Sequence, residues 1–552
     1  MWLMWVAVAF GVEEFEGHTF VFGDIHSHTG ASGDGGSADL GHCIRASDDT
    51  PADCGSVADL GEIALANGLD FLATVDHVTA VAATTTAEAF ETVFHSVNEL
   101  HDPSSGFVTL PGAEIFVELP GGAELGHRSL LFFGTKTILS GVSMGDLQPS
   151  GSLSNVVPNC AALSTFMGGV ESTFGPALLI PHHPGVDKPM PTDWSCHDPR
   201  WSPVVEAYSE HGSSLDSTSG FDPPWSGFAA SGTVRFALDP EGHGHQIGLV
   251  GGTDNHDTHP GDVCRTDTVL DHHPYGGGLT GAVLEVPGSF GRVGLYEAFR
   301  ARRTYTTTGP KLPVVLEVSE ASGATVAGMG EELLLPPDTG VSVQVRFPVA
   351  DDWTVSNVVA MGPTSEWELE RTEAGRWEAW IPASEIEAYL LIDVVIDGAL
   401  WFEDGCADGG DDAMEHLWLS PVWFGSPEPD VVDLDDDGVS VEEGDCDDTN
   451  PFVFPGAAEA CGMMGADHDC DGVPSELDSD CDEPDTGSEP DTGGEPAAVE
   501  DSGEPERTTP ADPEGHTDEP KSEGCTHLSR NGVHPWWVLA GLGLMFRRVR
   551  RS

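Results

Sequence analysis

The chain has 552 residues, and its 93 Asp and Glu against 22 Lys and Arg give a formal net charge of -71. A surface this acidic repels phosphate backbones, which excludes general nucleic-acid binding. The length allows several domains, and the acidic residues concentrate beyond about residue 425, so the last quarter differs in kind from the rest.

Residues 1–17 are interpreted as a signal segment that is truncated at its start. Residues 2–11 are apolar but few, they lack a positively charged beginning, and Ala7-Val8-Ala9 fits a small-x-small cleavage pattern. A hydrophobic first strand is the alternative, and this end of the chain does not decide between them.

Between residues 18 and 311, apolar runs alternate with amphipathic stretches. Residues 57–67 and 87–100 place apolar side chains at helical spacing, whereas residues 71–75 form a short apolar run typical of a buried strand. This repeated alternation of strand and helix predicts an α/β fold with a parallel sheet or barrel.

Histidine and acidic residues adjoin these apolar runs one after another. His26 and His28 stand two residues apart after the run 20–22, and an extended chain points such residues to the same side. Neutral imidazole is the commonest side-chain ligand of transition metals. Other apolar runs are followed in the same way by Asp76 and His77, Glu114, His182 and His183, and Asp254 and His256, whereas His127 precedes such a run and Glu206 lies within one. Because the carboxyl ends of barrel strands share one face, we expect these groups to converge.

The order of these motifs resembles the PHP (polymerase and histidinol phosphatase) superfamily, and in particular an uncharacterised subfamily of large secreted members. The resemblance covers about residues 18–424 and rests on His-x-His, Val75-Asp76-His77, Gly112-Ala113-Glu114, Pro181-His182 and the segment 252–256. It implies a distorted β/α barrel that holds two or three Zn, Mn or Fe ions and uses them to hydrolyse phosphoesters.

The resemblance also implies which residues hold each ion. The first ion would bind His26, His28, Glu114 and Asp254; the second Glu114, His127 and His182; the third Asp34, His77 and His256. Glu114 would bridge the first two ions. Asp34 stands where many members have His, which indicates a weaker third site or a harder metal. Either His182 or His183 is the ligand, and the family pattern favours His182.

The predicted catalytic residues are Glu114, Arg128, Asp254 and His256. Arg128, Lys188 and Arg265 are candidates to neutralise phosphate charge, although each is equally compatible with a plain surface charge. Asp76 is expected to orient an imidazole rather than to bind an ion. The expected substrate is a phosphorylated small molecule or a phosphodiester. The same ions would also suit an amide or carboxyl ester, and an inactive adhesion scaffold is the third interpretation.

Residues 312–424 change character, since short runs with alternating apolar side chains follow one another with turns between them. Examples are residues 341–347, 355–361, 377–381 and 389–396. This pattern predicts a small β-sandwich after the barrel.

Residues 430–482 form an Asp- and Cys-rich module. Its predicted structural calcium ligands are Asp433, Asp435, Asp437, Asp467, Asp469, Asp471 and Asp478. Carboxylates at alternate positions before a glycine are typical of calcium loops, but the first copy lacks the usual final Glu. The repeats resemble those of thrombospondin type 3 modules. Cys446, Cys461, Cys470 and Cys481 permit three disulfide pairings, and such a cluster indicates an oxidising compartment.

The end of the chain has two parts, an acidic linker over residues 483–524 and an anchor over residues 525–552. The linker is too charged and too poor in aromatic residues to fold, so it is predicted to be disordered. Cys525, the apolar residues 533–546 and the following arginines resemble the C-terminal sorting tags of myxobacteria-type surface proteins. A weak membrane anchor is the alternative. Both place the protein outside the cytoplasm, at a bacterial cell surface, with membrane association through this segment.

Overall fold

The computed structural model describes most of the chain up to Gly425 and scattered residues beyond it. The described ranges are 13–29, 57–78, 86–120, 123–148, 156–187, 191–221, 227–256, 259–261, 263, 276–285, 288–323, 325–349, 354–397, 415–425, 439, 441, 444–447, 449–450, 453–455, 457, 467–470 and 473. The chain divides into two units, Met1–Val432 and Asp433–Ser552. The predicted linker and anchor, residues 483–524 and 525–552, lie outside these ranges, as do residues 1–12 of the predicted signal segment 1–17. Residues 13–15 of that segment form a strand that pairs antiparallel with residues 18–20.

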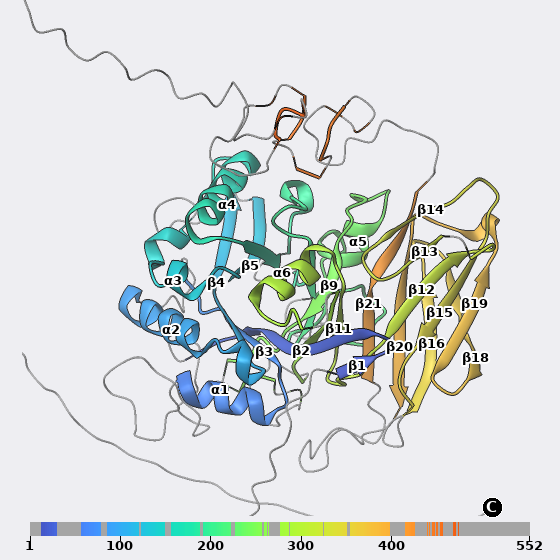
Figure 1. Cartoon of the computed structure of the whole chain (residues 1–552), viewed down its shortest axis with the longest axis horizontal. Coiled ribbons are helices and arrows are strands. Elements are labelled where there is room, and N and C mark those ends of the chain that lie inside the picture. Colours follow the sequence, from blue (N-terminus) through green and yellow to red (C-terminus); the bar gives the residue numbers. More distant parts are fainter. Residues whose placement is uncertain are drawn as a thin grey trace, which may run out of the picture. The chain divides into compact units, whose positions relative to one another are not determined.

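A thirteen-stranded sheet runs through the first unit (Figure 1). Its α/β part contains β1 (Glu13–Phe15), β2 (His18–Ser27), β3 (Phe71–Thr74), β4 (Val108–Leu119), β5 (Ala123–Phe132), β6 (Ala177–Pro181), β10 (Leu279–Leu284) and β11 (Thr304–Thr307). β3 pairs in parallel with β2 and β4. β4–β5, β5–β6 and β2–β10 pair antiparallel.

The predicted barrel is corrected by this topology. β7 (Val204–Ser209), β8 (Gly212–Ser213) and β9 (Gly248–Gly251) form a separate three-stranded sheet, in which β7 and β9 are parallel. The described strands therefore make an open, mixed arrangement rather than a closed barrel. The physical reason is the antiparallel β4–β5–β6 segment, which replaces the strand–helix–strand crossovers that a regular barrel requires.

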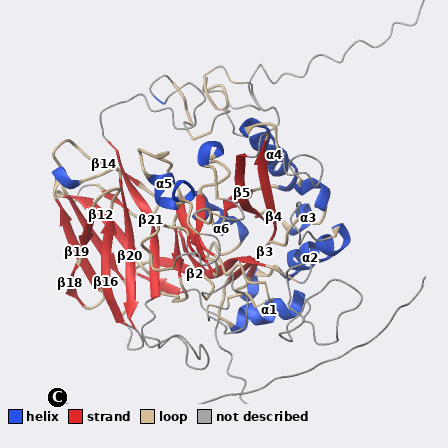
Figure 2. Ribbon diagram, turned by 180° about the vertical axis from the view of Figure 1, so that it is seen from behind, coloured by secondary structure: helices blue, strands red, loops and turns tan. Residues whose placement is uncertain are grey.

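The helices of this unit lie mainly beside β3, β4 and β5, at the end away from the later strands (Figure 2). They are α1 (Val57–Ala66), α2 (Ala87–Leu100), α3 (Lys136–Leu139), α4 (Cys160–Phe174), α5 (Val234–Leu238) and α6 (Arg292–Arg300), with short 3-10 helices η1 (Pro103–Ser105), η2 (Met144–Leu147), η3 (Trp194–Cys196), η4 (Ala230–Gly232) and η5 (Ala383–Glu385). α1 and α2 occupy the predicted positions. The Thr86 side chain caps α2 by accepting from the Ala89 amide, and Phe90 and Phe94 join the core beneath β4.

Residues 315–425 form two sheets around one apolar core. One sheet contains β12 (Val315–Glu320), β13 (Val326–Ala327), β15 (Val341–Arg346), β18 (Glu370–Glu373) and β19 (Arg376–Ile381). The other strands are β14 (Glu332–Leu334), β16 (Thr354–Met361), β17 (Glu366–Glu368), β20 (Tyr389–Asp397) and β21 (Glu415–Gly425). Val343 and Ile392, from opposite sheets, share this core. β21 also pairs antiparallel with β11, so the second set of strands continues the α/β sheet.

Two disulfides are present among the described residues. Cys160, the first residue of α4, is bonded to Cys196 at the end of η3, a pairing that the sequence analysis did not anticipate. In the second unit Cys446 is bonded to Cys470, which selects one of the three pairings left open for that module. Within the described part of the chain, the helices are all too short or too polar to cross a bilayer.

Candidate metal centre

The structure gathers the predicted ligands of the first two ions into one buried cluster. His26 lies in β2, Glu114 in β4 and His127 in β5, whereas His182 directly follows β6 and Asp254 lies beyond the end of β9. The sequence analysis placed Glu114 after a strand and His127 before one. Both instead lie within the long β4–β5 pair, because β4 leaves β3 after Pro111 and stays extended against β5.

Glu114 is the centre of this cluster, because its two carboxylate oxygens face different imidazoles. Oε1 contacts His127 Nδ1 and lies 2.9 Å from His182 Nε2. Oε2 lies 3.1 Å from His77 Nδ1 and 3.3 Å from His28 Nε2. The side chain is buried, so neither oxygen is shared with bulk solvent. One carboxylate between two sets of nitrogen donors is the geometry of a bridging ligand.

Asp254 presents its oxygens in a similar way. Oδ1 lies 3.2 Å from His26 Nε2 and 3.3 Å from both His28 Nε2 and His256 Nε2. Oδ2 lies 2.8 Å from Nε2 of His211, a residue absent from the predicted set. The backbone of Asp254 has a φ of 54°, which a residue other than glycine seldom adopts without a functional reason.

Two further carboxylates hold the ligands in place. Glu206 Oε2 lies 3.0 Å from His26 Nδ1, which leaves Nε2 of that ring directed at the cluster. Asp24 accepts hydrogen bonds from the amides of His26, Thr253 and Gly261 and from the Thr253 hydroxyl. These bonds tie β2 to the segment that carries Asp254. Asp76, expected to orient an imidazole, accepts two hydrogen bonds from Thr29, next to His28.

The proton affinities of the cluster follow from burial and from these pairings. Burial disfavours the charged imidazole, but Asp254, Glu206 and Glu114 outweigh it and hold the pKa of His26 well above its ordinary value. Burial and His26 likewise oppose protonation of His182, yet Glu114 and Glu206 raise its pKa to about 9. For Glu114, burial is outweighed by His77, His182 and His127, which leave its pKa well below the ordinary value. Burial lowers the pKa of His183 well below that of a free imidazole.

Five overlapping groups of residues offer donor atoms that all lie within 4.8 Å of one another. They are His26, His28 and Asp254; His26, Glu114 and His182; His28, His77 and Glu114; His127, His182 and His183; and His211, Asp254 and His256. The mixture of imidazole and carboxylate donors suits divalent transition metals. His211 extends the predicted set, and His183, left open as the alternative to His182, joins it. His211 comes two residues after β7 ends at Ser209, but its contact with Asp254 could not be read from the chain.

The other predicted site residues are placed differently. Arg128 is buried, but it follows His127 in β5, and neighbouring residues of a strand point to opposite faces. Its guanidinium donates to the Leu125 carbonyl, and it pairs across the sheet with Ile115 of the apolar core. His77 and His256 approach Glu114 and Asp254, respectively. Asp34, Lys188 and Arg265 lie outside the described residues.

Comparison with known proteins found one family match, and it lies in the second unit. Residues 445–476 match the family model Cu-binding_MopE, whose description is "Putative metal-binding motif". The curated proteins and the solved structures gave no match. The matched stretch lies within the predicted module 430–482, so it supports metal binding there without specifying calcium. Of the seven predicted calcium ligands only Asp467 and Asp469 are described, and they flank His468, whose carbonyl accepts from the Phe454 amide.

Proposed function

We propose that the first unit is a metal-dependent hydrolase, in the first instance a phosphoesterase that acts outside the cytoplasm. The observation that carries the proposal is Glu114, whose two oxygens each face two imidazoles in a buried cluster. The order of the motifs, which resembles that of the PHP superfamily, supports the same activity. Bound divalent ions would supply a water of lowered pKa and positive charge for phosphoryl oxygens.

The residues of the chain would prepare the site for that chemistry. Glu206 fixes the ring of His26, and Asp24 fixes the position of β2 against the Asp254 segment. Glu114 and Asp254 would balance the charge of the ions. Arg128 faces away from the cluster, so it is not placed to neutralise a phosphate there. The ions themselves would supply that positive charge, and Lys188 and Arg265 remain the other candidates.

The test is metal content and turnover of the full chain beside three variants, His26→Ala, Glu114→Gln and Asp254→Asn. We expect bound transition metal and cleavage of 4-nitrophenyl phosphate or bis(4-nitrophenyl) phosphate, with turnover falling at least 100-fold in each variant. His243→Ala, which replaces an exposed histidine, is the matched control and should keep full activity. Bound metal with cleavage of an amide or acetate ester, and of neither phosphate ester, would favour the interpretation as an amide or carboxyl-ester hydrolase. A chain that binds no transition metal would favour the interpretation as an inactive adhesion scaffold.

For the second unit we propose that residues 445–476 bind a structural metal ion, with calcium as the first candidate. The family match and the Asp-rich sequence support the site, and the Cys446–Cys470 disulfide holds its two ends together. The midpoint temperature of thermal unfolding should rise with added Ca²⁺. No rise with Ca²⁺ would contradict the calcium proposal, whereas a rise with Cu²⁺ does not by itself assign copper to this stretch, because the histidines of the first unit are also copper ligands by their chemistry.

A further inference from the structure

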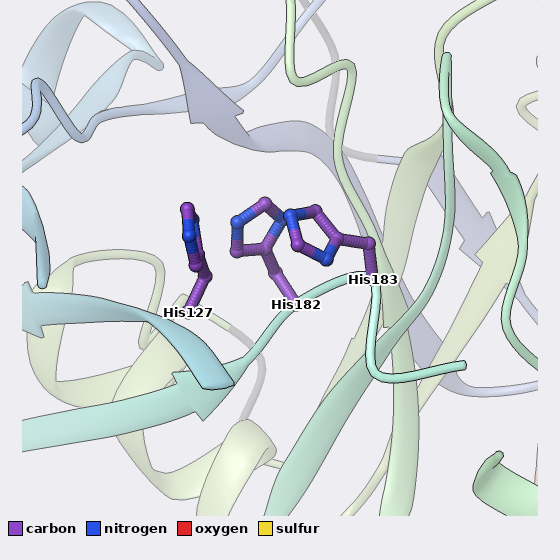
Figure 3. A group of neighbouring side chains, drawn as sticks. All are labelled: His127, His182 and His183. Carbon is purple, nitrogen blue, oxygen red and sulfur yellow. The ribbon is translucent and has the colours of Figure 1, made fainter. Parts of the chain in front are cut away.

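His127, His182 and His183 form a group of three imidazoles beside the carboxylate-rich part of the centre (Figure 3). The ring centroids lie 5.5 Å apart for His127 and His182, 5.0 Å for His127 and His183, and 3.8 Å for the two consecutive residues. All three side chains are buried. One donor atom from each ring lies within 4.8 Å of the other two. Three nitrogen donors are thus close enough to share one ion.

The backbone at His183 makes this arrangement possible. Consecutive residues of an extended chain point to opposite sides, so His182 and His183 would normally diverge. His183 instead has a φ of 33°, in the left-handed region that a residue other than glycine seldom occupies. This turn brings its ring against that of His182 just after β6 ends at Pro181. Strain that brings two donor side chains together is typical of functional sites.

One nitrogen on each ring of the group makes no hydrogen bond, although Nδ1 of His182 lies 3.6 Å from Asp254 Oδ2 and 3.7 Å from Glu206 Oε1. Nε2 of His127, Nδ1 of His182 and Nδ1 of His183 are all buried without a hydrogen bond. Buried polar atoms are nearly always satisfied in folded proteins, so three unsatisfied nitrogens on adjacent rings require an explanation. An ion that takes lone pairs from this group accounts for them better than apolar packing, which would leave them unpaired.

We propose that His127, His182 and His183 hold one ion by imidazole donors and that this position selects zinc or copper over manganese. The inference rests on the metal centre of the proposed function, but it concerns which ion is bound rather than which bond is cleaved. Affinity for nitrogen donors rises from manganese to copper, whereas carboxylate oxygens suit manganese. The groups formed by His26, His28 and Asp254 and by His211, Asp254 and His256 each include a carboxylate, whereas this group offers three imidazoles, so the positions of one centre would prefer different metals.

The experiment uses the full chain stripped of metal and dialysed against a 100-fold excess of Mn²⁺ with one equivalent of Zn²⁺ or Cu²⁺. Metal content is measured by mass spectrometry, and copper coordination by electron paramagnetic resonance. The wild type should retain about one Zn²⁺ against the manganese, and its copper spectrum should show three coupled nitrogens. His183→Ala should lose at least tenfold of the zinc preference and one coupled nitrogen. Because residues 445–476 match a metal-binding motif, the spectra are also recorded with a second equivalent of Cu²⁺, which loads that stretch in both proteins and lets its signal cancel in the difference spectrum.

Two control variants keep the result interpretable. His243→Ala should match the wild type, and His183→Gln, which preserves side-chain volume better, should reproduce the His183→Ala result if that variant folds poorly. A His183→Ala protein that retains zinc against manganese and the three-nitrogen signal would overturn the inference. A wild type that loads manganese throughout would overturn it as well. Failure of the hydrolase proposal looks different, because turnover would be absent while the metal selectivity remained.

Discussion

Glu206 shows how a residue that is not a predicted ion ligand controls one that is. Its Oε2 atom lies 3.0 Å from His26 Nδ1, so the opposite nitrogen of the ring is left for the centre. Such carboxylate partners fix the ring orientation and increase the basicity of the ligand. The sequence analysis placed Glu206 among the converging groups, but the spacing of residues along the chain did not reveal that it contacts His26.

Replacing Glu206 by Gln should therefore weaken metal binding without removing a ligand. We expect the affinity for Zn²⁺ to fall by about 10- to 100-fold, measured by competition with a chromogenic chelator. Glu241→Gln, at an exposed position, is the matched control. Equal affinity in the two variants would show that the contact with His26 has no influence on the centre.

Asp24 makes a different contribution, because it joins two segments through hydrogen bonds. Burial raises its pKa to about 6, even though Thr253, His26 and Gly261 all donate to it. Thr253→Val removes the hydroxyl donor while keeping the shape of the side chain. A hydrogen bond to a charged group is worth about 1.5–3 kcal/mol, so we expect the free energy of unfolding at pH 7 to fall by that amount.

Urea unfolding of the metal-free protein measures this loss, with the exposed Thr372→Val as control. The difference should shrink at pH 5, because Asp24 is then mostly protonated in the folded chain and no longer presents a full charge to the hydroxyl. An effect of the same size at both pH values would contradict the assignment to the carboxylate.

Among the helices and strands, the spacing of apolar residues predicted the bounds of those elements whose structure depends mainly on their own sequence. α1 and α2 lie at the predicted positions, and β15, β16, β19 and β20 lie within a residue of the predicted runs. Apolar spacing specifies such elements locally. The partners of a strand depend on the rest of the chain, and this is where the prediction of a parallel barrel was wrong. β4 and β5 pair antiparallel, and Pro120-Gly121-Gly122 between them is a hairpin signal that the sequence analysis did not use. β5 and β6 also pair antiparallel, although α3 and α4 lie between them in the chain, so this pairing has no local signal.

The candidate site shows the same contrast between what the local sequence determines and what the rest of the fold determines. Ligand types and their order could be read from the chain, and the structure brings together those that it describes. The positions of His183 and His211 could not be read in this way, since one depends on a left-handed backbone and the other on contact with Asp254. Arg128 was misplaced for a simpler reason. It neighbours a ligand in sequence, and within a strand that very neighbour faces the opposite side.

The Cys160–Cys196 disulfide joins the start of α4 to η3 across 36 residues of sequence. Closing a loop of this size restricts the unfolded chain, so the double variant Cys160→Ser and Cys196→Ser should lose about 2–4 kcal/mol of stability. Urea unfolding measures this, and its metal content should stay unchanged because neither cysteine contributes to the five ligand groups. If reduced and oxidised wild type unfold at the same urea concentration, the disulfide contributes nothing.

For the whole molecule, the buried charges predict that pH acts in opposite directions with and without metal. The folded pKa of His182 is about 9, above the ordinary 6.5, so its contribution is complete below pH 6.5 and is lost as pH rises through 9. The folded pKa of Asp24 is about 6, above 3.8, so the cost of its buried charge is relieved as pH falls through 6. Histidines whose pKa burial lowers, such as His127 and His183, gain stability as pH rises to about 7, so the loss from His182 should show above that pH. Between pH 6.5 and 9 the metal-free protein should lose about 3 kcal/mol of stability through His182.

With metal bound the trend should reverse, because protons compete with the ions for the same imidazoles. Urea midpoints at pH 7 and pH 8.5, in chelator and in excess Zn²⁺, measure both trends. Two trends of the same sign would show that the ions do not bind to the groups that titrate.

The pairing of β21 with β11 has a consequence for how the protein is made. Ser420 of β21 donates to the Thr304 carbonyl and accepts from the Leu249 amide, so β9, which precedes Asp254, is held by a strand near the end of the unit. His26 leaves the ribosome early, but the support behind its partner Asp254 is absent until translation has passed Gly425. Metal should consequently be acquired only after synthesis of this unit is complete, in whichever compartment the finished chain reaches.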